Sequence, residues 1–167
     1  MRKIILASSS IHRKKLLKQI KLNFIAISPD IDESRNKNES VNKFVKRLSI
    51  EKAMKIAVLR KNSIVIGSDE IAVVDDKILG KPLTKKNARK QLNLISGKKV
   101  IFKTGICVID TNTMKKLSSV VNYSIKMRKI SKNTINNYID KEDMLNCAAS
   151  IRIEGLAISL IEKASGE

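Results

Sequence analysis

The sequence predicts an α/β or α+β domain built on a mixed, twisted sheet that is flanked by helices. Short, continuous apolar runs are typical of strands that are covered on both faces. Between them, apolar residues recur at steps of three and four after a capping Ser or Thr, which predicts amphipathic helices. Hairpin signals interrupt this alternation, so parallel and antiparallel strands should share one sheet. A chain of 167 residues is long enough for one well-buried domain, and we expect residues 1–167 to form it.

The first predicted strand covers residues 3–7, and Ser10 is placed to cap the helix that follows. The apolar side of this helix should consist of three residues at helical spacing, Leu16, Leu17 and Ile20. Its first turn is cationic, although a helix N-terminus already carries a partial positive charge, so an anionic ligand would make this turn favourable. A second strand is predicted at 24–28, and residues 28–40 are polar and turn-rich, as in an exposed loop.

A long helix is predicted from Ser40 to about Arg60. Its core-facing stripe should consist of Val41, Val45, Leu48, Lys52, Ile56 and Leu59. A lysine on such a stripe either extends its ammonium outward to solvent or points it into a cleft with an anionic occupant. From this pattern alone we expect the ammonium of Lys52 to reach solvent.

A buried strand at 63–67 should be followed by Ser68, Asp69 and Glu70, which places Asp69 at a strand end. Residues 71–74 and 78–79 flank "DDK", which is a hairpin signal, and residues 80–82 should form a loop. The next helix should begin after Thr84, with Ala88, Leu92 and Ile95 inward, and close at Gly97.

The last third of the chain should add strands at 100–109 and 117–127, the second with an alternation of period two that is typical of a half-buried strand. A short helix should begin after Ser131 and bury three residues, Ile135, Tyr138 and Ile139. Residues 156–161 are strand-like.

The composition is that of a soluble globular protein, with 43% hydrophobic and 30% charged residues. No apolar run reaches the about 18 residues that span a bilayer, and the N-terminal apolar stretch is too short for a signal peptide. Cys107 and Cys147 are too few for a disulfide framework and lack metal-ligand spacing, so both should be reduced and buried. These features predict a cytoplasmic protein with no membrane contact.

The net charge of +18 invites a nucleic-acid interpretation. The Lys residues, however, are spread over the whole length and do not gather into one stripe. Aromatic residues make up only 3% of the chain, which leaves few platforms on which single-stranded bases could stack. We therefore expect a solvated basic surface and no specific nucleic-acid partner.

Two acidic positions and one basic set are the candidates for chemistry. Asp69 and Glu33 could share a hard divalent ion such as Mg²⁺, which prefers oxygen ligands; alternatively, Asp69 caps a turn and Glu33 is a solvated loop acid. The basic and hydroxyl residues that could converge on one polyanion are Ser8, Ser10, Arg13, Lys52 and Lys81. His12 is the only histidine and lies in a basic turn, which makes a Ser-His-Asp triad a weak option.

These same places match the motifs of a known family. "LASSSIHRKKLL" resembles the L-A-S-x-S-P-R-R-x-x-L-L opening of the Maf-like nucleotide pyrophosphatases, "SPDIDES" resembles their S-x-I-D-E segment, and "EKA" at 51–53 resembles their x-K-A. "GSDEIAVVDDKILGKP" is similar to their strand, acid and G-K-P run, and looks like the 7-methyl-GTP pyrophosphatase subgroup, which carries S-D-Q there. "SGKKVIFKTG" and "NCAASIRIEGLAISLIE" also align, so the likeness covers essentially the whole chain.

The resemblance implies an α/β fold of the Maf/ITPase-like kind, with two lobes around a cleft, and a hydrolase that depends on a divalent metal, Mg²⁺ or Mn²⁺. The implied reaction cleaves a nucleoside triphosphate between its α and β phosphates to give a monophosphate and pyrophosphate. Asp69 would be the general base and also touch the metal, with Glu33 as a metal ligand. The phosphates would be bound by Ser8, Ser10, Arg13, Lys52 and Lys81, the last of these acting with Asp69 in catalysis.

Three positions would select the base: His12, Glu70 and Glu154. Guanine offers N–H donors on one edge and 7-methylation makes its ring cationic, so carboxylate acceptors suit 7-methyl-GTP. Glu154 fits the subgroup pattern, whereas Glu70 stands where an amide is usual. The near alternative is a dTTP and UTP pyrophosphatase of the same family. The alternatives from other classes are a non-catalytic basic protein associated with nucleic acid, and an inactive remnant.

The chain departs from the family pattern in further places. Ile11 and His12 replace the usual Pro-Arg, and Ala149 stands where a glycine is usual. The chain ends at "EKASGE", where the family usually continues with a loop, an apolar segment and a final helix. The resemblance thus implies either a domain shortened at its C-terminus, in which the homodimer typical of the family would be weakened, or a C-terminal end that is packed in some other way.

Overall fold

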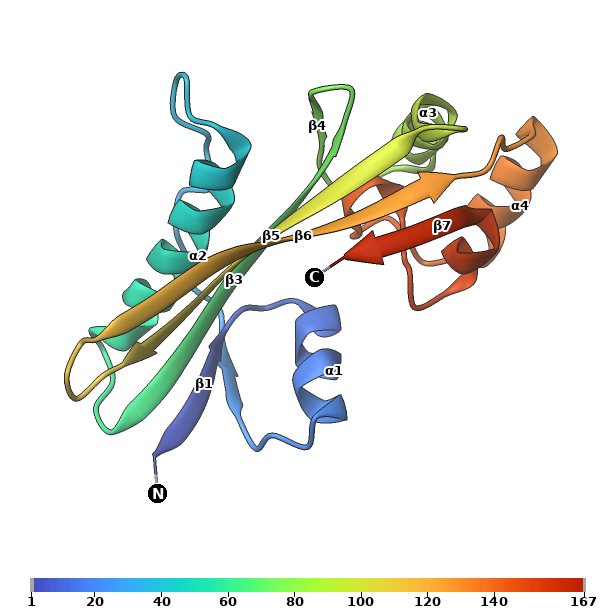
Figure 1. Ribbon diagram of the computed structural model, residues 1–167. Coiled ribbons are helices and arrows are strands. Elements are labelled where there is room, and N and C mark those ends of the chain that lie inside the picture. Colours follow the sequence, from blue (N-terminus) through green and yellow to red (C-terminus); the bar gives the residue numbers. More distant parts are fainter. Residues whose placement is uncertain (1, 167) are drawn as a thin grey trace. The chain divides into compact units, whose positions relative to one another are not determined.

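The computed structural model describes residues 2–166 and shows the mixed α/β architecture that the sequence predicts (Figure 1). The strands of this part of the chain are β1 (Lys3–Ala7), β2 (Ile25–Ile27), β3 (Ser63–Val74), β4 (Lys77–Leu79), β5 (Lys99–Asp110), β6 (Lys116–Met127) and β7 (Ile161–Gly166). The α-helices are α1 (Ile11–Gln19), α2 (Val41–Ala57), α3 (Lys85–Ile95) and α4 (Lys132–Lys141). Two 3-10 helices, η1 (Ala148–Ser150) and η2 (Leu156–Leu160), lie near the C-terminus.

Hydrogen-bonded strands follow the order β2-β1-β3-β5-β6-β7, and β4 pairs with β3. β1 is parallel to β2 and to β3, with Ala7 opposite Gly67, because helical connections return the chain to the same edge. β4 and β7 are antiparallel to their partners β3 and β6. The sheet is therefore mixed, as predicted.

The chain divides into two compact units, each built from discontinuous segments. The first unit comprises the chain up to Asp69 together with Thr104–Val120, and the second comprises Glu70–Lys103 and the chain from Val121 onward. The long strands β3, β5 and β6 contribute residues to both units. Each unit is described separately below.

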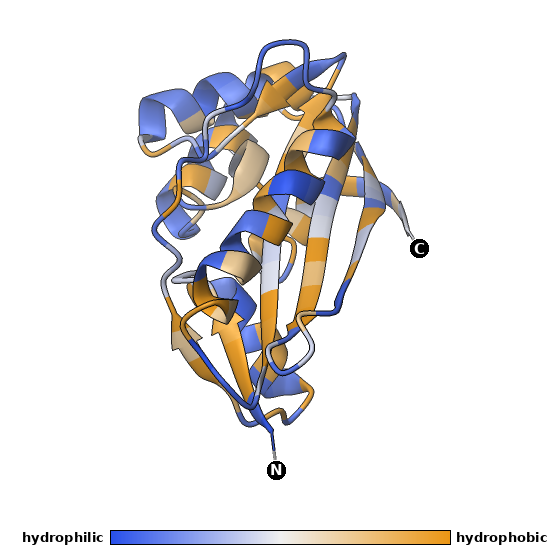
Figure 2. Ribbon diagram, turned by 90° about the vertical axis from the view of Figure 1, so that its left-hand side faces the viewer, coloured by the Kyte–Doolittle hydropathy of each residue, from blue (hydrophilic) through white to orange (hydrophobic). Residues whose placement is uncertain are grey.

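The core of the first unit lies between α2 and the strands. Its buried apolar residues are Ile5, Ala7, Ala53, Ile56, Ala57, Val65, Cys107 and Ile109. Ser40 caps α2 as predicted, its hydroxyl accepting a hydrogen bond from the backbone N–H of Lys43. Figure 2 shows the strands as largely apolar, whereas the helices carry many hydrophilic positions. This amphipathic pattern is what fixes the face that α2 presents to the sheet.

The predicted apolar side of α1 is wrong. α1 begins after Ser10 as expected, and the Ser10 hydroxyl accepts from the backbone N–H of Arg13, but no residue of the helix is buried. Leu16 and Ile20 are 61% and 64% exposed. Hydrophobic spacing shows only that a face could be buried; whether another element covers it depends on tertiary structure.

The second unit has its own apolar cluster, which contains the inward residues predicted for α3 and α4. Asp75 and Asp76, both with positive φ, form the two-residue turn between β3 and β4, as the hairpin signal predicts. Gly97 closes α3 with a φ of 69°, also as predicted. The strand expected at 156–161 is wrong: Leu156–Leu160 forms η2, and β7 begins at Ile161.

Ala149 occupies a left-handed backbone conformation, with φ 53° and ψ 19°, and is fully buried. The left-handed conformation costs an L-residue about 1–2 kcal/mol, whereas losing one buried methyl group costs about 0.8 kcal/mol. We expect Ala149→Gly to raise the free energy of unfolding by about 0.5 kcal/mol, because the relief of strain is the larger effect. Urea unfolding measures this, and the neighbouring Ala148→Gly, at a negative φ, should lower stability instead. Equal losses in both variants would contradict the assignment of strain to Ala149.

Both cysteines are free thiols, Cys107 buried and Cys147 half-buried. Burial raises the pKa of the Cys107 thiol, and it raises the pKa of Cys147 to about 11, with a further contribution from the negative charge of Glu154. Among residues 2–166, no helix combines the length and apolar character needed to cross a membrane.

Candidate active site

Lys52 is the centre of the candidate site in the first unit. Its Nζ lies 2.6 Å from Oδ1 of Asp69 and 2.8 Å from Oε1 of Glu33. The side chain of Lys52 is only 7% exposed, so the expectation that its ammonium reaches solvent is wrong. The structure instead pairs the ammonium with two carboxylates of the protein itself, those of Asp69 and Glu33.

Asp69 lies inside β3 and not at a strand end, which corrects the sequence-based placement. Buried and half-buried residues alternate along this strand, and Asp69 shares the buried face with Val65 and Gly67. A carboxylate fits on that face because the ammonium of Lys52 pairs with it. The apolar run in the sequence ends at Gly67, but the strand itself continues to Val74. Hydrophobicity indicates which residues are buried and does not show where the hydrogen bonding of a strand ends.

Gly67 brings α2 close enough for this pairing. A Cβ atom built on Gly67 would lie 2.2 Å from the backbone O of Ser49 and 2.7 Å from the backbone N of Ala53. Gly105 of β5 plays the same part, since its Cβ would lie 2.2 Å from the backbone O of Val45. Only glycine permits such close packing of a helix on a strand. These two glycines are the signal in the sequence for the close approach of α2 to the strands, and the sequence analysis missed them.

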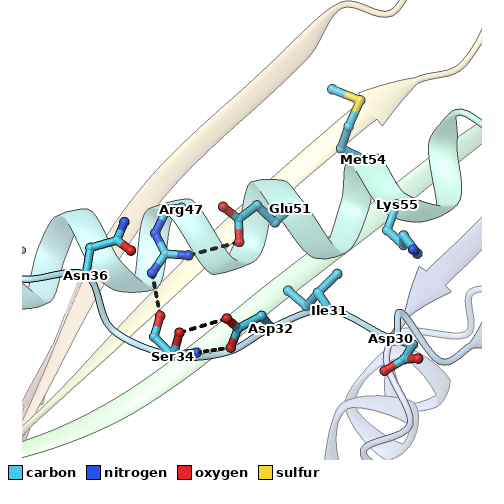
Figure 3. A pocket seen from close by; sticks show the side chains of 9 residues that line it. All are labelled: Asp30, Ile31, Asp32, Ser34, Asn36, Arg47, Glu51, Met54 and Lys55. Atoms are coloured by element: carbon cyan, nitrogen blue, oxygen red, sulfur yellow. Dashed lines mark hydrogen bonds and ion pairs between the residues drawn. The ribbon is translucent and has the colours of Figure 1, made fainter.

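The loop that carries Glu33 is braced on both sides of that residue. Asp32 accepts hydrogen bonds from the backbone N–H and the hydroxyl of Ser34, at 2.8 and 2.9 Å (Figure 3). The backbone bond from Ser34 holds the pKa of Asp32 below its usual value. Nη2 of Arg47 donates to the backbone O of Ser34 at 2.9 Å, which ties the loop to α2. These contacts fix the backbone around Glu33 and direct its carboxylate to Lys52.

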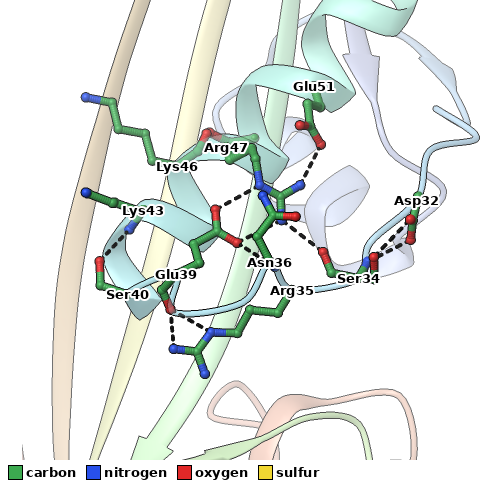
Figure 4. Close-up of polar contacts among 11 residues, drawn as sticks. Asp32, Ser34, Arg35, Asn36, Glu39, Ser40, Lys43, Lys46, Arg47 and Glu51 are labelled. Atoms are coloured by element: carbon green, nitrogen blue, oxygen red, sulfur yellow. Dashed lines mark hydrogen bonds and ion pairs between the residues drawn. The ribbon is translucent and has the colours of Figure 1, made fainter.

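Arg47 is a second residue that the sequence reasoning missed. Its guanidinium bonds to both carboxylate oxygens of Glu39, at 2.8 and 2.9 Å, and to Glu51 at 3.0 Å (Figure 4). The pairing with Arg47 lowers the pKa of Glu39 and raises that of the guanidinium. These bonds, with the one to the backbone O of Ser34, show that Arg47 supports the loop. The cavity beside it is lined by Asp30, Ile31, Asp32, Ser34, Asn36, Arg47, Glu51, Met54 and Lys55.

The start of α1 is tied to the backbone next to Asp69. Nη1 of Arg13 donates to the carbonyl O of Ser68 at 2.7 Å. Ser8 is 5% exposed, and its hydroxyl accepts from the backbone N–H of Ser10 at 3.1 Å. The first unit therefore brings together Ser8, Ser10 and Arg13 with the strand that carries Asp69. His12, in the same turn, is half-buried.

The donor chemistry of this site suits a hard divalent cation. Two carboxylates from different segments, Glu33 and Asp69, converge on one positive charge, which is the ammonium of Lys52. Mg²⁺ commonly uses one or two carboxylates and takes its other ligands from water and phosphate. Within residues 2–166 no cluster of three or more His, Cys, Asp or Glu side chains could hold a metal by itself. Any metal here would need oxygen atoms from a ligand.

The remaining predicted residues, Glu70, Lys81 and Glu154, belong to the second unit, and all three are exposed. The loop that carries Lys81 is anchored at the carbonyl O of Gly80, which accepts from Nε2 of Gln91 at 3.0 Å and from the backbone N–H of Ala149 at 3.3 Å. The guanidinium of Arg152 lies 3.6 Å from Oε1 of Glu154.

The fold and this set of residues define an α/β protein with a cluster of paired charges in its first unit. The chain matches the Maf-like protein family over residues 3–167, and it belongs to that family, which confirms the resemblance seen in its motifs. It is 42% identical over 165 residues to the 7-methyl-GTP pyrophosphatase of Aliivibrio fischeri (99% of this chain, 86% of that protein). It is 41% identical over 164 residues to the protein of the same name from Pseudomonas aeruginosa (98% and 85%).

Among solved structures, the Ham1 protein of Staphylococcus aureus has a similar fold. The TM-score is 0.52 at 20% sequence identity, over 77% of this chain and 73% of that one. This likeness confirms the predicted fold class.

Proposed function

We propose that this protein is a metal-dependent nucleoside triphosphate pyrophosphatase that hydrolyses 7-methyl-GTP to the monophosphate and pyrophosphate. The observation that carries the proposal is the pairing of the buried Lys52 ammonium with Asp69 and Glu33, next to the Arg13 contact with Ser68. Relatives that carry the name 7-methyl-GTP pyrophosphatase, at about 40% identity over nearly the whole chain, support the choice of nucleotide.

In this reaction the oxygen of a water molecule attacks the α-phosphorus, and the bond between that phosphorus and the α–β bridging oxygen breaks. Asp69 accepts the proton of the attacking water, and pyrophosphate leaves with the bridging oxygen. Glu33 and Asp69 would hold a divalent cation, which would supply positive charge to the phosphate oxygens. Phosphoryl transfer depends mainly on positioning and charge neutralisation, which is why a cluster of charged groups suffices.

The phosphate-binding residues proposed here are Ser8, Ser10, Arg13, Lys52 and Lys81. The hydroxyls and the start of α1 offer hydrogen-bond donors, and the partial positive charge of the helix N-terminus adds to that of Arg13. A bound triphosphate would offer phosphate oxygens as further partners for the Lys52 ammonium.

His12, Glu70 and Glu154 are the proposed specificity residues. Carboxylates accept hydrogen bonds from the N1–H and N2–H₂ donors of guanine and attract the cationic ring of 7-methylguanine. The cellular nucleotide pool is cytoplasmic, so we place the protein in the cytoplasm. The family resemblance also implies a homodimer, and analytical ultracentrifugation tests whether the protein forms one.

Pyrophosphate release from a panel of 7-methyl-GTP, GTP, dTTP, UTP and ATP, with Mg²⁺ or Mn²⁺, tests this proposal. We expect 7-methyl-GTP to have the highest kcat/KM and EDTA to abolish release. Faster cleavage of dTTP and UTP would show that the protein is instead a dTTP and UTP pyrophosphatase of the same family. Release from no nucleotide, together with duplex-DNA binding that weakens steeply with salt, would favour the nucleic-acid alternative.

A further inference from the structure

The segment that carries Glu154 is held by α4 and by the residue that ends this helix. Tyr138 lies in the last turn of α4, and Glu142 is its C-cap residue. The hydroxyl of Tyr138 donates to the carbonyl O of Ser150 at 3.0 Å and accepts from the backbone N–H of Arg152 at 3.3 Å. Both of these contacts precede Glu154 in the chain.

Glu142 contacts residues on both sides of Glu154 in the chain. Its carboxylate accepts from Nη1 of Arg152 at 2.7 Å and from the backbone N–H of Leu156 at 2.6 Å. The Glu142 side chain is only 6% exposed. Burial alone would raise its pKa, but the bonds from Leu156 and Arg152 outweigh burial and hold the pKa below its usual value.

Gly155 allows the Glu142 carboxylate to come close to the backbone of this loop. A Cβ atom at Gly155 would lie 2.1 Å from Oε2 and 2.8 Å from Cδ of Glu142. The residue directly after Glu154 therefore has to be glycine for the carboxylate to reach the backbone of Leu156.

Arg152 connects the buried carboxylate to the exposed one. Its Nη1 is bonded to Glu142, while its Nε lies 3.6 Å from Oε1 of Glu154 and, among residues 2–166, has no hydrogen-bond partner. Glu142 thus fixes the guanidinium, and the guanidinium faces the carboxylate of Glu154 with an N–H that is not otherwise used.

We propose that Glu142 is a positioning residue for base recognition: it locks Arg152 and the Leu156 backbone so that the Glu154 carboxylate is held ready for the purine ring. This inference rests on the proposed function, in which Glu154 selects the base. A preorganised carboxylate discriminates between a cationic and a neutral ring more strongly than a mobile one, because no ordering cost is paid on binding. Glu142 itself touches no substrate.

The experiment compares wild type with Glu142→Gln, Glu154→Gln and the double variant. Isothermal titration calorimetry measures the affinities for 7-methyl-GMP and GMP, so the readout does not require turnover. We expect Glu142→Gln to reduce the preference for 7-methyl-GMP about fivefold to tenfold. In the Glu154→Gln background it should change the preference by less than twofold, because residues that act through one another are not additive. Asp140→Asn, which removes an exposed ion pair of the same helix with Lys85, is the matched control and should leave the preference unchanged.

Amide hydrogen exchange provides the second readout, and it separates positioning from general loss of stability. In Glu142→Gln the Leu156 amide should exchange at least tenfold faster, while amides of β5 keep their protection. An unchanged preference in Glu142→Gln, or an equal loss with and without the Glu154 carboxylate, would overturn the proposal. If the variants give either of those results while the wild type hydrolyses 7-methyl-GTP, only the positioning role is overturned and the proposed function stands. A wild type that releases no pyrophosphate from 7-methyl-GTP would overturn both.

Discussion

At saturating Mg²⁺, Asp69→Asn should lower kcat for 7-methyl-GTP by about a thousandfold, because the general base acts in the transition state. Since Asp69 is also a proposed ligand of the metal, the variant should need more Mg²⁺ to reach its maximal rate. The amide has nearly the same shape and can still accept a hydrogen bond from Lys52 through its oxygen, but it cannot take a proton from water. Glu33 also continues to pair with the Lys52 ammonium, at 2.8 Å in the wild type. The fold should therefore survive the substitution.

Stopped-flow detection of pyrophosphate measures this loss, and circular dichroism checks the fold. Asp140→Asn makes the same chemical change at a 67% exposed side chain of α4 and should retain wild-type turnover. If Asp69→Asn kept more than a tenth of the wild-type kcat, another group would have to be the base.

Gly67→Ala should produce the largest loss of stability, about 3 kcal/mol or more, because the added methyl group meets backbone and not flexible side chains. Its nearest contacts would be the backbone O of Ser49 at 2.2 Å, the backbone N of Ala53 at 2.7 Å and the Cβ of Ala53 at 2.8 Å. This clash can be relieved only if α2 moves away from β3. Lys52 directly precedes Ala53 in the helix, so the same movement would lengthen its contact with Asp69, and activity should fall with stability.

Urea unfolding and pyrophosphate release measure the two effects. Gly80→Ala is the stability control, since a Cβ atom at Gly80 would meet nothing within 4 Å. We expect its free energy of unfolding to lie within about 0.5 kcal/mol of wild type. A Gly67→Ala variant as stable as Gly80→Ala would show that α2 does not pack on β3 as described.

The candidate site was only partly predictable from the sequence. Motifs pointed to the candidate residues of the first unit, whereas the pairing of Asp69 and Glu33 through Lys52 was not predicted. Two supporting residues were missed as well, one beside the Glu33 loop and one beside the segment of Glu154. Arg47 and Glu142 resemble ordinary members of charged helices in the sequence, and only their several short contacts and low exposure distinguish them. Such contacts join residues from different segments, so no local pattern reports them.

The sequence by itself determined the helices, the hairpin and the class of fold, because capping residues, turn residues and hydrophobic periodicity act within a few neighbouring positions. The starts of α1, α2, α3 and α4 at Ser10, Ser40, Thr84 and Ser131 were all predicted correctly. Only the tertiary structure decided that β3 continues through Asp69, that Leu16 and Ile20 of α1 stay exposed, and that Leu156–Leu160 is a 3-10 helix. Each of these outcomes depends on which distant group pairs with a backbone or covers a side chain, and that is fixed by packing rather than by the local sequence.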